Sequence, residues 1–168
     1  MERGQHRMPA VMHSHYLRTL YGRNELAEKK YLLDGSILDL SDITCDTYVV
    51  GAINDHIVPW TSSYKSVGLL GGNVRYVLTS GGHVAGAVNP PSPKAWFEAV
   101  GAADDDKVEL PTDPKAWHDK ATRHSGASWW EDWTVWSTTR AGALVAPPSM
   151  GSKENPVLGD APGTYVFS

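Results

Sequence analysis

The sequence predicts an α/β fold in which parallel strands are flanked by helices. Two runs of apolar, largely β-branched residues, 47–53 and 74–79, are typical of strands, and the stretch between them has helical spacing. The first run is almost continuously apolar, as expected for a strand that is covered on both faces. Pro59 favours the start of the intervening helix, and Gly71-Gly72 favours its end.

A carboxylate and a histidine follow the two expected strands. Asp55 comes just after the first strand and His83 just after the second, 28 positions further along the chain. Gly81 and Gly82 allow a sharp turn, which we expect to place His83 at the tip of a loop. The order strand, acid, helix, strand, histidine is that of the last two triad members in an α/β-hydrolase. The alternative is that Asp55 only caps the following helix and His83 is an ordinary loop residue.

The residues around this pair resemble the acid and histidine motifs of polyhydroxyalkanoate synthases. The motifs are DHIVPW at 55–60, with Tyr64 four positions later, and GHVAGAVNPP at 82–91. The segments SWWEDW at 128–133 and APGTYV at 161–166 resemble C-terminal signatures of that family, and Met8-Pro9 and 16–18 also fit it. The resemblance covers nearly the whole chain but only the C-terminal part of a family member. It implies the C-terminal portion of an α/β-hydrolase fold with an aromatic-rich helical tail.

Polyhydroxyalkanoate synthases join (R)-3-hydroxyacyl units from coenzyme A thioesters into a polyester, release CoA, and carry the growing chain on a cysteine. The resemblance implies that His83 is the general base for that cysteine. It implies that Asp55 is the acid partner and helps to activate the 3-hydroxyl group of the incoming monomer. It also implies no metal and no prosthetic group, a homodimer, a cytoplasmic location and contact with the polyester granule surface.

Four further residues belong to the expected site. His56, beside the acid, is expected to support the loop. Trp60 and Tyr64 either shape the pocket or pack the helix, and packing is the favoured interpretation. Asn89 is expected to line the pocket or to support it.

The nucleophile segment of the family, a G-x-C-x-G elbow, does not occur in this sequence, and neither does G-x-S-x-G. We therefore expect a fragment, or half of a split enzyme, that is inactive without the missing N-terminal part of the synthase. Cys45 is not expected to act as nucleophile, because it precedes the strand rather than following it and has no flanking glycines to build a strained elbow. Two other interpretations remain: a fragment of a generic hydrolase or esterase, and a non-catalytic relative that keeps a dimer or granule contact.

Composition limits the remaining possibilities. The 168 residues are 41% hydrophobic, enough for a core, and the net charge of −4 without a basic cluster argues against nucleic acid. No apolar run is long enough for a transmembrane segment. We divide the chain into a helix and hairpin (1–46), the acid and histidine part of the core (47–92), C-terminal helices with a tryptophan cluster (93–146) and a Pro/Gly-rich tail along the surface (147–168).

Local signals predict the elements outside the core. A helix is expected at 9–21, a short helix at 24–31, and a hairpin turn at Asp34-Gly35. Asp113-Pro114 favours the start of a helix that carries Trp117. Trp129, Trp133 and Trp136 recur at helical spacing, and we expect this stripe to pack on the main body rather than to form a dimer or granule contact. With two core strands only, the sheet edge would be open to association.

Overall fold

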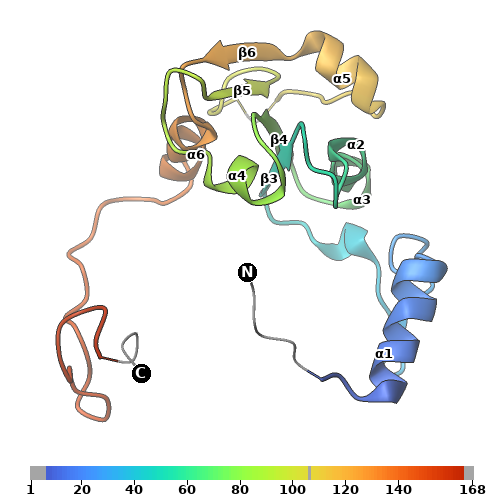
Figure 1. The fold of residues 1–168 in the computed structure, drawn as a ribbon, viewed down its shortest axis with the longest axis horizontal. Helices are drawn as coiled ribbons and strands as arrows, with labels where there is room; N and C mark the ends of the chain where they lie inside the picture. Colours follow the sequence, from blue (N-terminus) through green and yellow to red (C-terminus); the bar gives the residue numbers. More distant parts are fainter. Residues whose placement is uncertain (1–6, 106, 165–168) are drawn as a thin grey trace.

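The computed structural model describes residues 7–105 and 107–164 (Figure 1). In this part of the chain, four strands form the central sheet in the order β3-β4-β5-β6. Strands β3 (Thr47–Ala52) and β4 (Val74–Thr79) are parallel and paired from Thr47 opposite Val74 to Ala52 opposite Thr79. Strands β5 (Trp96–Ala99) and β6 (Thr122–Ser125) are both antiparallel to their neighbours. The α/β class is confirmed, but the sheet is mixed and not purely parallel, and it has two more strands than expected.

Helices cover both faces of this sheet. On one face lie α2 (Trp60–Ser63), α3 (Ser66–Leu69) and α5 (Pro114–Lys120), and on the other lie α4 (His83–Val88) and α6 (Trp129–Thr138) (Figure 1). Alternate strand residues face opposite sides. The first core cluster therefore consists of Tyr64, Tyr76, Leu78 and Trp117, and the second consists of Val77, Phe97, Ala99 and Trp129.

Two helix predictions need correction. The segment expected as one helix after Pro59 forms two single turns, α2 and α3. The short helix predicted at 24–31 is wrong: this segment forms turns, and Asn24 and Lys29 adopt left-handed φ angles of 49° and 54°, which interrupt a helix.

Other local predictions are confirmed. The expected N-terminal helix is α1 (Ala10–Tyr16), and it continues as the π-helix η1 (Leu17–Gly22). Asp34 and Gly35, with φ of 47° and 78°, turn the hairpin of β1 (Leu32–Leu33) and β2 (Ser36–Ile37). A short 3-10 turn, η2 (Leu40–Asp42), then leads toward β3.

Both ends of the described chain lead away from the sheet (Figure 1). Residues 141–164 are exposed throughout, and in Figure 1 they extend outward, so the tail does not lie along the surface as expected. Its proline and glycine residues favour turns and extended backbone over helix or strand, and its large apolar side chains, such as Leu144 and Leu158, are exposed. None of the helices within the described residues has the length and hydropathy needed to cross a membrane.

Candidate active site

Asp55 lies in the turn that connects β3 to α2. Its Oδ1 atom accepts hydrogen bonds from the backbone N–H groups of Ile57 and Val58, both at 2.9 Å. This local pairing is typical of an aspartate that stabilises its own turn. These two bonds fix the Asp55 side chain within its own turn. The second oxygen, Oδ2, takes no part in them and can accept a hydrogen bond from another element.

His83 is the first residue of α4, and not the tip of a loop as expected. Gly81, with a left-handed φ of 108°, turns the chain after β4, and the helix begins two residues later. The Nδ1 atom of His83 lies 2.9 Å from Oδ2 of Asp55. The side chain of Asp55 is 11% exposed and that of His83 is 43% exposed, so the carboxylate is shielded while the imidazole faces outward.

The electrostatics of the pair favour an ionised acid. The hydrogen bond from the Val58 N–H lowers the pKa of Asp55 to about 2, together with the contributions of His83 and Ile57. An ionised carboxylate at Nδ1 favours the tautomer that carries its proton there, which leaves Nε2 as the proton acceptor. The structure therefore brings the two residues predicted from the sequence into the arrangement of a base and its orienting acid.

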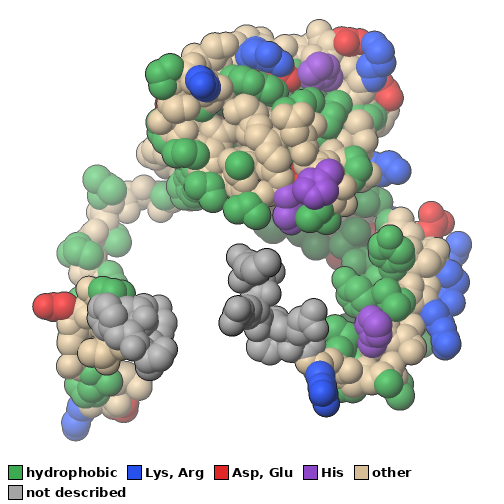
Figure 2. Space-filling view, viewed as in Figure 1, with side chains coloured by type: hydrophobic (Ala, Val, Ile, Leu, Met, Phe, Trp, Pro, Cys, Tyr) green, Lys and Arg blue, Asp and Glu red, His purple; other side chains and the backbone are tan. Residues whose placement is uncertain are grey.

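A hollow of about 260 Å³ lies beside this pair. Within the described residues, β3 pairs only with β4, so the outer edge of β3 borders the hollow. Its lining consists of Val50, Gly51, Ala52, Asp55, Val58, Ser63, His83 and Ala87. Histidine side chains lie next to apolar ones on this part of the surface (Figure 2). Ser63 was not predicted, because a single serine in a helical stretch carries no distinct signal.

Trp60 and Tyr64 do not line this hollow. Tyr64 is 1% exposed, and its hydroxyl donates to the carbonyl of Pro111 at 2.5 Å. Trp60 packs against the same core cluster, with its ring centroid 6.2 Å from that of Trp117. The position of both residues agrees with the packing interpretation.

His56 and Asn89 lie in contrasting environments. The side chain of His56 is exposed next to the acid. Asn89 is 3% exposed, ends α4 with a left-handed φ of 30°, and donates through Nδ2 to the carbonyl of Ser80 at 3.3 Å. Asn89 thereby joins the two ends of the segment that contains His83, while it does not line the hollow.

Cys45 is remote from the pair. It precedes β3, whereas Asp55 follows that strand, and six extended residues separate the two ends by roughly 17 Å. The described part of the chain also contains no group of three or more His, Cys, Asp or Glu side chains that could hold a metal ion.

The chain is similar to enzymes that make polyesters. Poly(3-hydroxyalkanoate) polymerase 2 of Ectopseudomonas oleovorans is 41% identical over 165 residues, 96% of this chain and 28% of the relative. The poly(3-hydroxyalkanoate) polymerase subunit PhaC of Cupriavidus necator is 39% identical over 95% of this chain and 26% of the relative, and that of Rhizobium etli is 36% identical over 96% and 24%. No family model matches the sequence.

The expected resemblance to the polyhydroxyalkanoate synthases is therefore confirmed: over nearly all of its length, this chain is related to a segment of these polymerases. The chain spans about a quarter of the length of these relatives, from 24% to 28%. The chain described above therefore matches one segment of these relatives, and most of their length lies outside the match.

Proposed function

We propose that this chain supplies the acid and the histidine of a polyhydroxyalkanoate synthase, within the C-terminal part of an α/β-hydrolase fold. The observation that carries the proposal is the 2.9 Å hydrogen bond between His83 and Asp55, at the carboxyl ends of two neighbouring parallel strands. The similarity to poly(3-hydroxyalkanoate) polymerases over 96% of the chain supports the choice of reaction.

In the proposed reaction, Nε2 of His83 accepts the thiol proton of a cysteine that lies outside this chain. The thiolate attacks the thioester carbonyl of an (R)-3-hydroxyacyl-CoA, the bond to sulfur of CoA breaks, and the departing CoA thiolate takes the proton from His83. Ester formation follows when a 3-hydroxyl group attacks the carbonyl of the acyl-cysteine and gives its proton to His83. The bond from the acyl carbon to the cysteine sulfur then breaks, and the departing cysteine thiolate takes that proton and is again a thiol. Asp55 stabilises the imidazolium in each step, because it stays ionised and hydrogen-bonded to Nδ1.

The position of the hollow beside β3 supports the proposal that His83 acts on a cysteine from outside this chain. His83 borders this hollow at the outer edge of the strand, where the part of the synthase outside this chain would bring its cysteine. The proposed chemistry needs no metal and no prosthetic group, since a thiolate and a base suffice for acyl transfer.

Exposed apolar side chains of α4 and α6 fit an apolar product. Val84 and Val88 of α4 are 69% and 57% exposed, and Trp130 and Trp133 of α6 are 43% and 38% exposed. A patch of this kind suits contact with a polyester or with a second copy of the chain. We propose that the synthase acts in the cytoplasm, as a homodimer at the surface of the polyester granule, and the exposed apolar side chains support contact with such a surface.

Complementation tests the proposal. The purified chain is mixed with the region of the Cupriavidus necator polymerase that it does not match, and CoA release from 3-hydroxybutyryl-CoA is followed with a thiol reagent. We expect release only when both parts are present, and a loss of about a thousandfold or more for His83→Ala. His13→Ala is the control, since this exposed histidine lies on α1 and neither lines the hollow nor takes part in the Asp55–His83 hydrogen bond.

Two outcomes would contradict the proposal. Unchanged CoA release by the complemented His83→Ala variant would show that the base lies elsewhere. Release by this chain alone that disappears in Cys45→Ser would show that the chain contains its own nucleophile.

A further inference from the structure

Helix α4 begins with His83, and the carbonyl groups in its last turn have no backbone N–H donors from the residues that follow. In a regular helix, the carbonyls of Gly86 and Ala87 would accept from the N–H groups of residues 90 and 91. Both of these residues are proline and have no N–H group. The carbonyls therefore need donors from other parts of the molecule.

Four side chains supply these donors, one for each carbonyl from 86 to 89. The hydroxyl of Thr79 in β4 donates to Gly86 at 3.0 Å, and the other three bonds run from Trp129 Nε1 to Ala87 at 3.1 Å, from Trp130 Nε1 to Val88 at 3.0 Å and from Ser128 Oγ to Asn89 at 2.5 Å. Three of the donors are thus consecutive residues at the start of α6. We call residues 128–130 the capping segment.

The middle of α4 is held just as closely against the sheet. Gly86 is its buried residue, and a Cβ atom built there would lie 2.3 Å from the Cβ of Ala52 in β3. The fully buried hydroxyl of Thr79 also lies 3.2 Å from the carbonyl of Gly51. Helix α4 is therefore fixed between β3, β4 and the capping segment.

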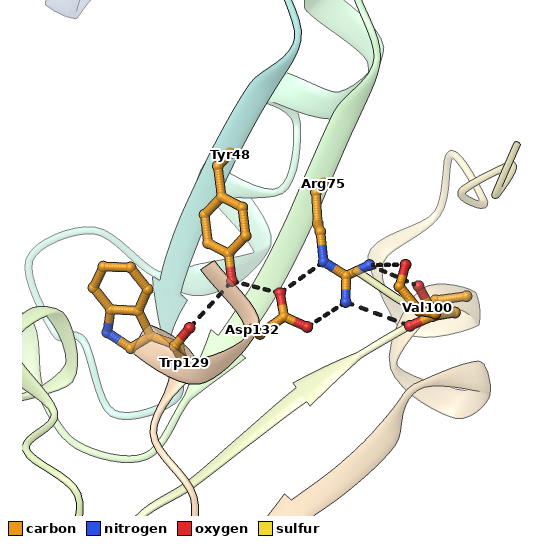
Figure 3. Close-up of polar contacts among 7 residues, drawn as sticks. Tyr48, Arg75, Val100, Trp129 and Asp132 are labelled. Atoms are coloured by element: carbon orange, nitrogen blue, oxygen red, sulfur yellow. Dashed lines mark hydrogen bonds and ion pairs between the residues drawn. The ribbon is translucent and has the colours of Figure 1, made fainter. Parts of the chain in front are cut away.

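The capping segment is itself anchored to the sheet. Asp132 of α6 accepts hydrogen bonds from Arg75 Nε at 2.7 Å, Arg75 Nη2 at 2.5 Å and the hydroxyl of Tyr48 at 2.7 Å (Figure 3). The side chains of Arg75 and Asp132 are only 9% and 7% exposed. Ser128 and Glu131 add a capping box that starts α6 at this position.

We propose that the capping segment positions His83: Trp129, Trp130 and Ser128, with Thr79, hold α4 so that the imidazole meets Asp55. Asp55 is fixed by its own turn, so the 2.9 Å contact depends on the placement of α4. These four are positioning residues, since none of them lines the hollow. Their importance for catalysis rests on the proposed function, whereas their effect on α4 does not.

Trp130→Phe is the most direct test, because it removes the indole N–H and keeps an aromatic ring at a half-exposed position. In the complete chain, labelled with ¹⁵N, we expect the downfield Nδ1–H signal of His83 to weaken. We also expect the amide protons of Gly86 and Asn89 to exchange about threefold to tenfold faster. These N–H groups donate to the carbonyls of Gly82 and Ala85 at 2.7 and 2.8 Å. Trp133→Phe is the matched control, because its indole nitrogen makes no hydrogen bond within the described residues.

Unchanged exchange and an unchanged His83 signal in Trp130→Phe would overturn the inference, as would equal changes in Trp133→Phe. Thr79→Val, which keeps the shape of the side chain and removes its hydroxyl, gives the same test from β4 if Trp130→Phe does not fold. These measurements need no substrate. The two proposals can therefore fail separately. If Trp130→Phe changes the exchange rates and the His83 signal as expected, but His83→Ala remains active in the complementation assay, the proposed function is refuted and the positioning role is not.

Discussion

The two carboxylate oxygens of Asp55 have separate partners. Oδ1 is held by the turn through Ile57 and Val58, and Oδ2 meets His83. The two interpretations of Asp55 therefore concern different atoms of one side chain. Oδ1 stabilises the turn before the helix, and Oδ2 is the atom that the catalytic interpretation requires. An asparagine could still accept the turn bonds through its oxygen, but it would present an amide group and no charge to the imidazole.

Asp55→Asn is therefore expected to change the pH dependence of stability. The folded-state pKa of Asp55, about 2, lies below the value of about 4 in an unfolded chain. Its contribution to the free energy of unfolding is thus fully present above pH 4 and disappears as the pH falls toward 2. Urea unfolding at a series of pH values should show a constant difference between the original chain and Asp55→Asn above pH 4, which narrows below it. A difference that stays constant down to pH 2 would contradict this assignment.

The short helix α4 depends on the absence of a side chain at Gly86. Gly86→Ala would force a methyl group to within 2.3 Å of Ala52, so the helix must shift and the free energy of unfolding should fall by about 1–3 kcal/mol. Gly68→Ala in α3 is the control, because a Cβ atom there meets nothing within 4 Å, and it should be neutral or stabilising. Urea unfolding measures both variants. Additional substitution of Ala52→Gly should recover part of the loss, and no recovery would mean that the contact is not the cause.

The sequence predicted those elements that carry their own local signals. Strands β3 and β4 have apolar runs, α5 has the start signal Asp113-Pro114, and α6 has tryptophans at helical spacing. Strand β6 was missed because its four residues are polar and exposed, so no face alternates. Strand β5 lies in a sequence that follows several prolines and was interpreted as part of a helical region.

The candidate site, too, was predicted only where the sequence carries a signal. Asp55 and His83 were predicted, because the order of strands along the chain brings their ends to one edge. The capping of α4 was not predicted, because Trp129 and Trp130 lie about 40 positions from the carbonyls they bind. The one local hint was the pair Pro90-Pro91, which leaves two carbonyls without backbone donors.

The sheet joins segments that are distant in sequence, and its outer strand β3 is bordered by the hollow of the candidate site. The expectation of an open edge therefore concerns β3, while β5 and β6 extend the sheet on the other side of β4. Polar contacts hold this arrangement together as well as apolar ones. The clearest example is Asp132, 57 positions from Arg75 and 84 from Tyr48.

Burial makes this contact sensitive to the loss of one partner. Arg75 also donates to the carbonyls of Val100, Gly101 and Ala102, so its guanidinium joins α6 to the loop after β5 as well as to β4 (Figure 3). Burial and the adjacent Asp132 carboxylate raise the pKa of Tyr48, which therefore stays protonated and continues to donate. Removing Arg75 would leave a buried carboxylate with one neutral donor.

Arg75→Met should consequently lower the free energy of unfolding by about 3–5 kcal/mol, measured by urea denaturation. The double variant Arg75→Met with Asp132→Leu removes both charges, so part of this loss should be recovered, since an apolar pair can replace a buried ion pair. Lys115→Met is the surface control, because its ion pair with Asp119 is exposed to solvent and should contribute little to the free energy of unfolding. An effect of Arg75→Met as small as that of Lys115→Met would show that α6 is held to the sheet by its tryptophans, without help from the ion pair.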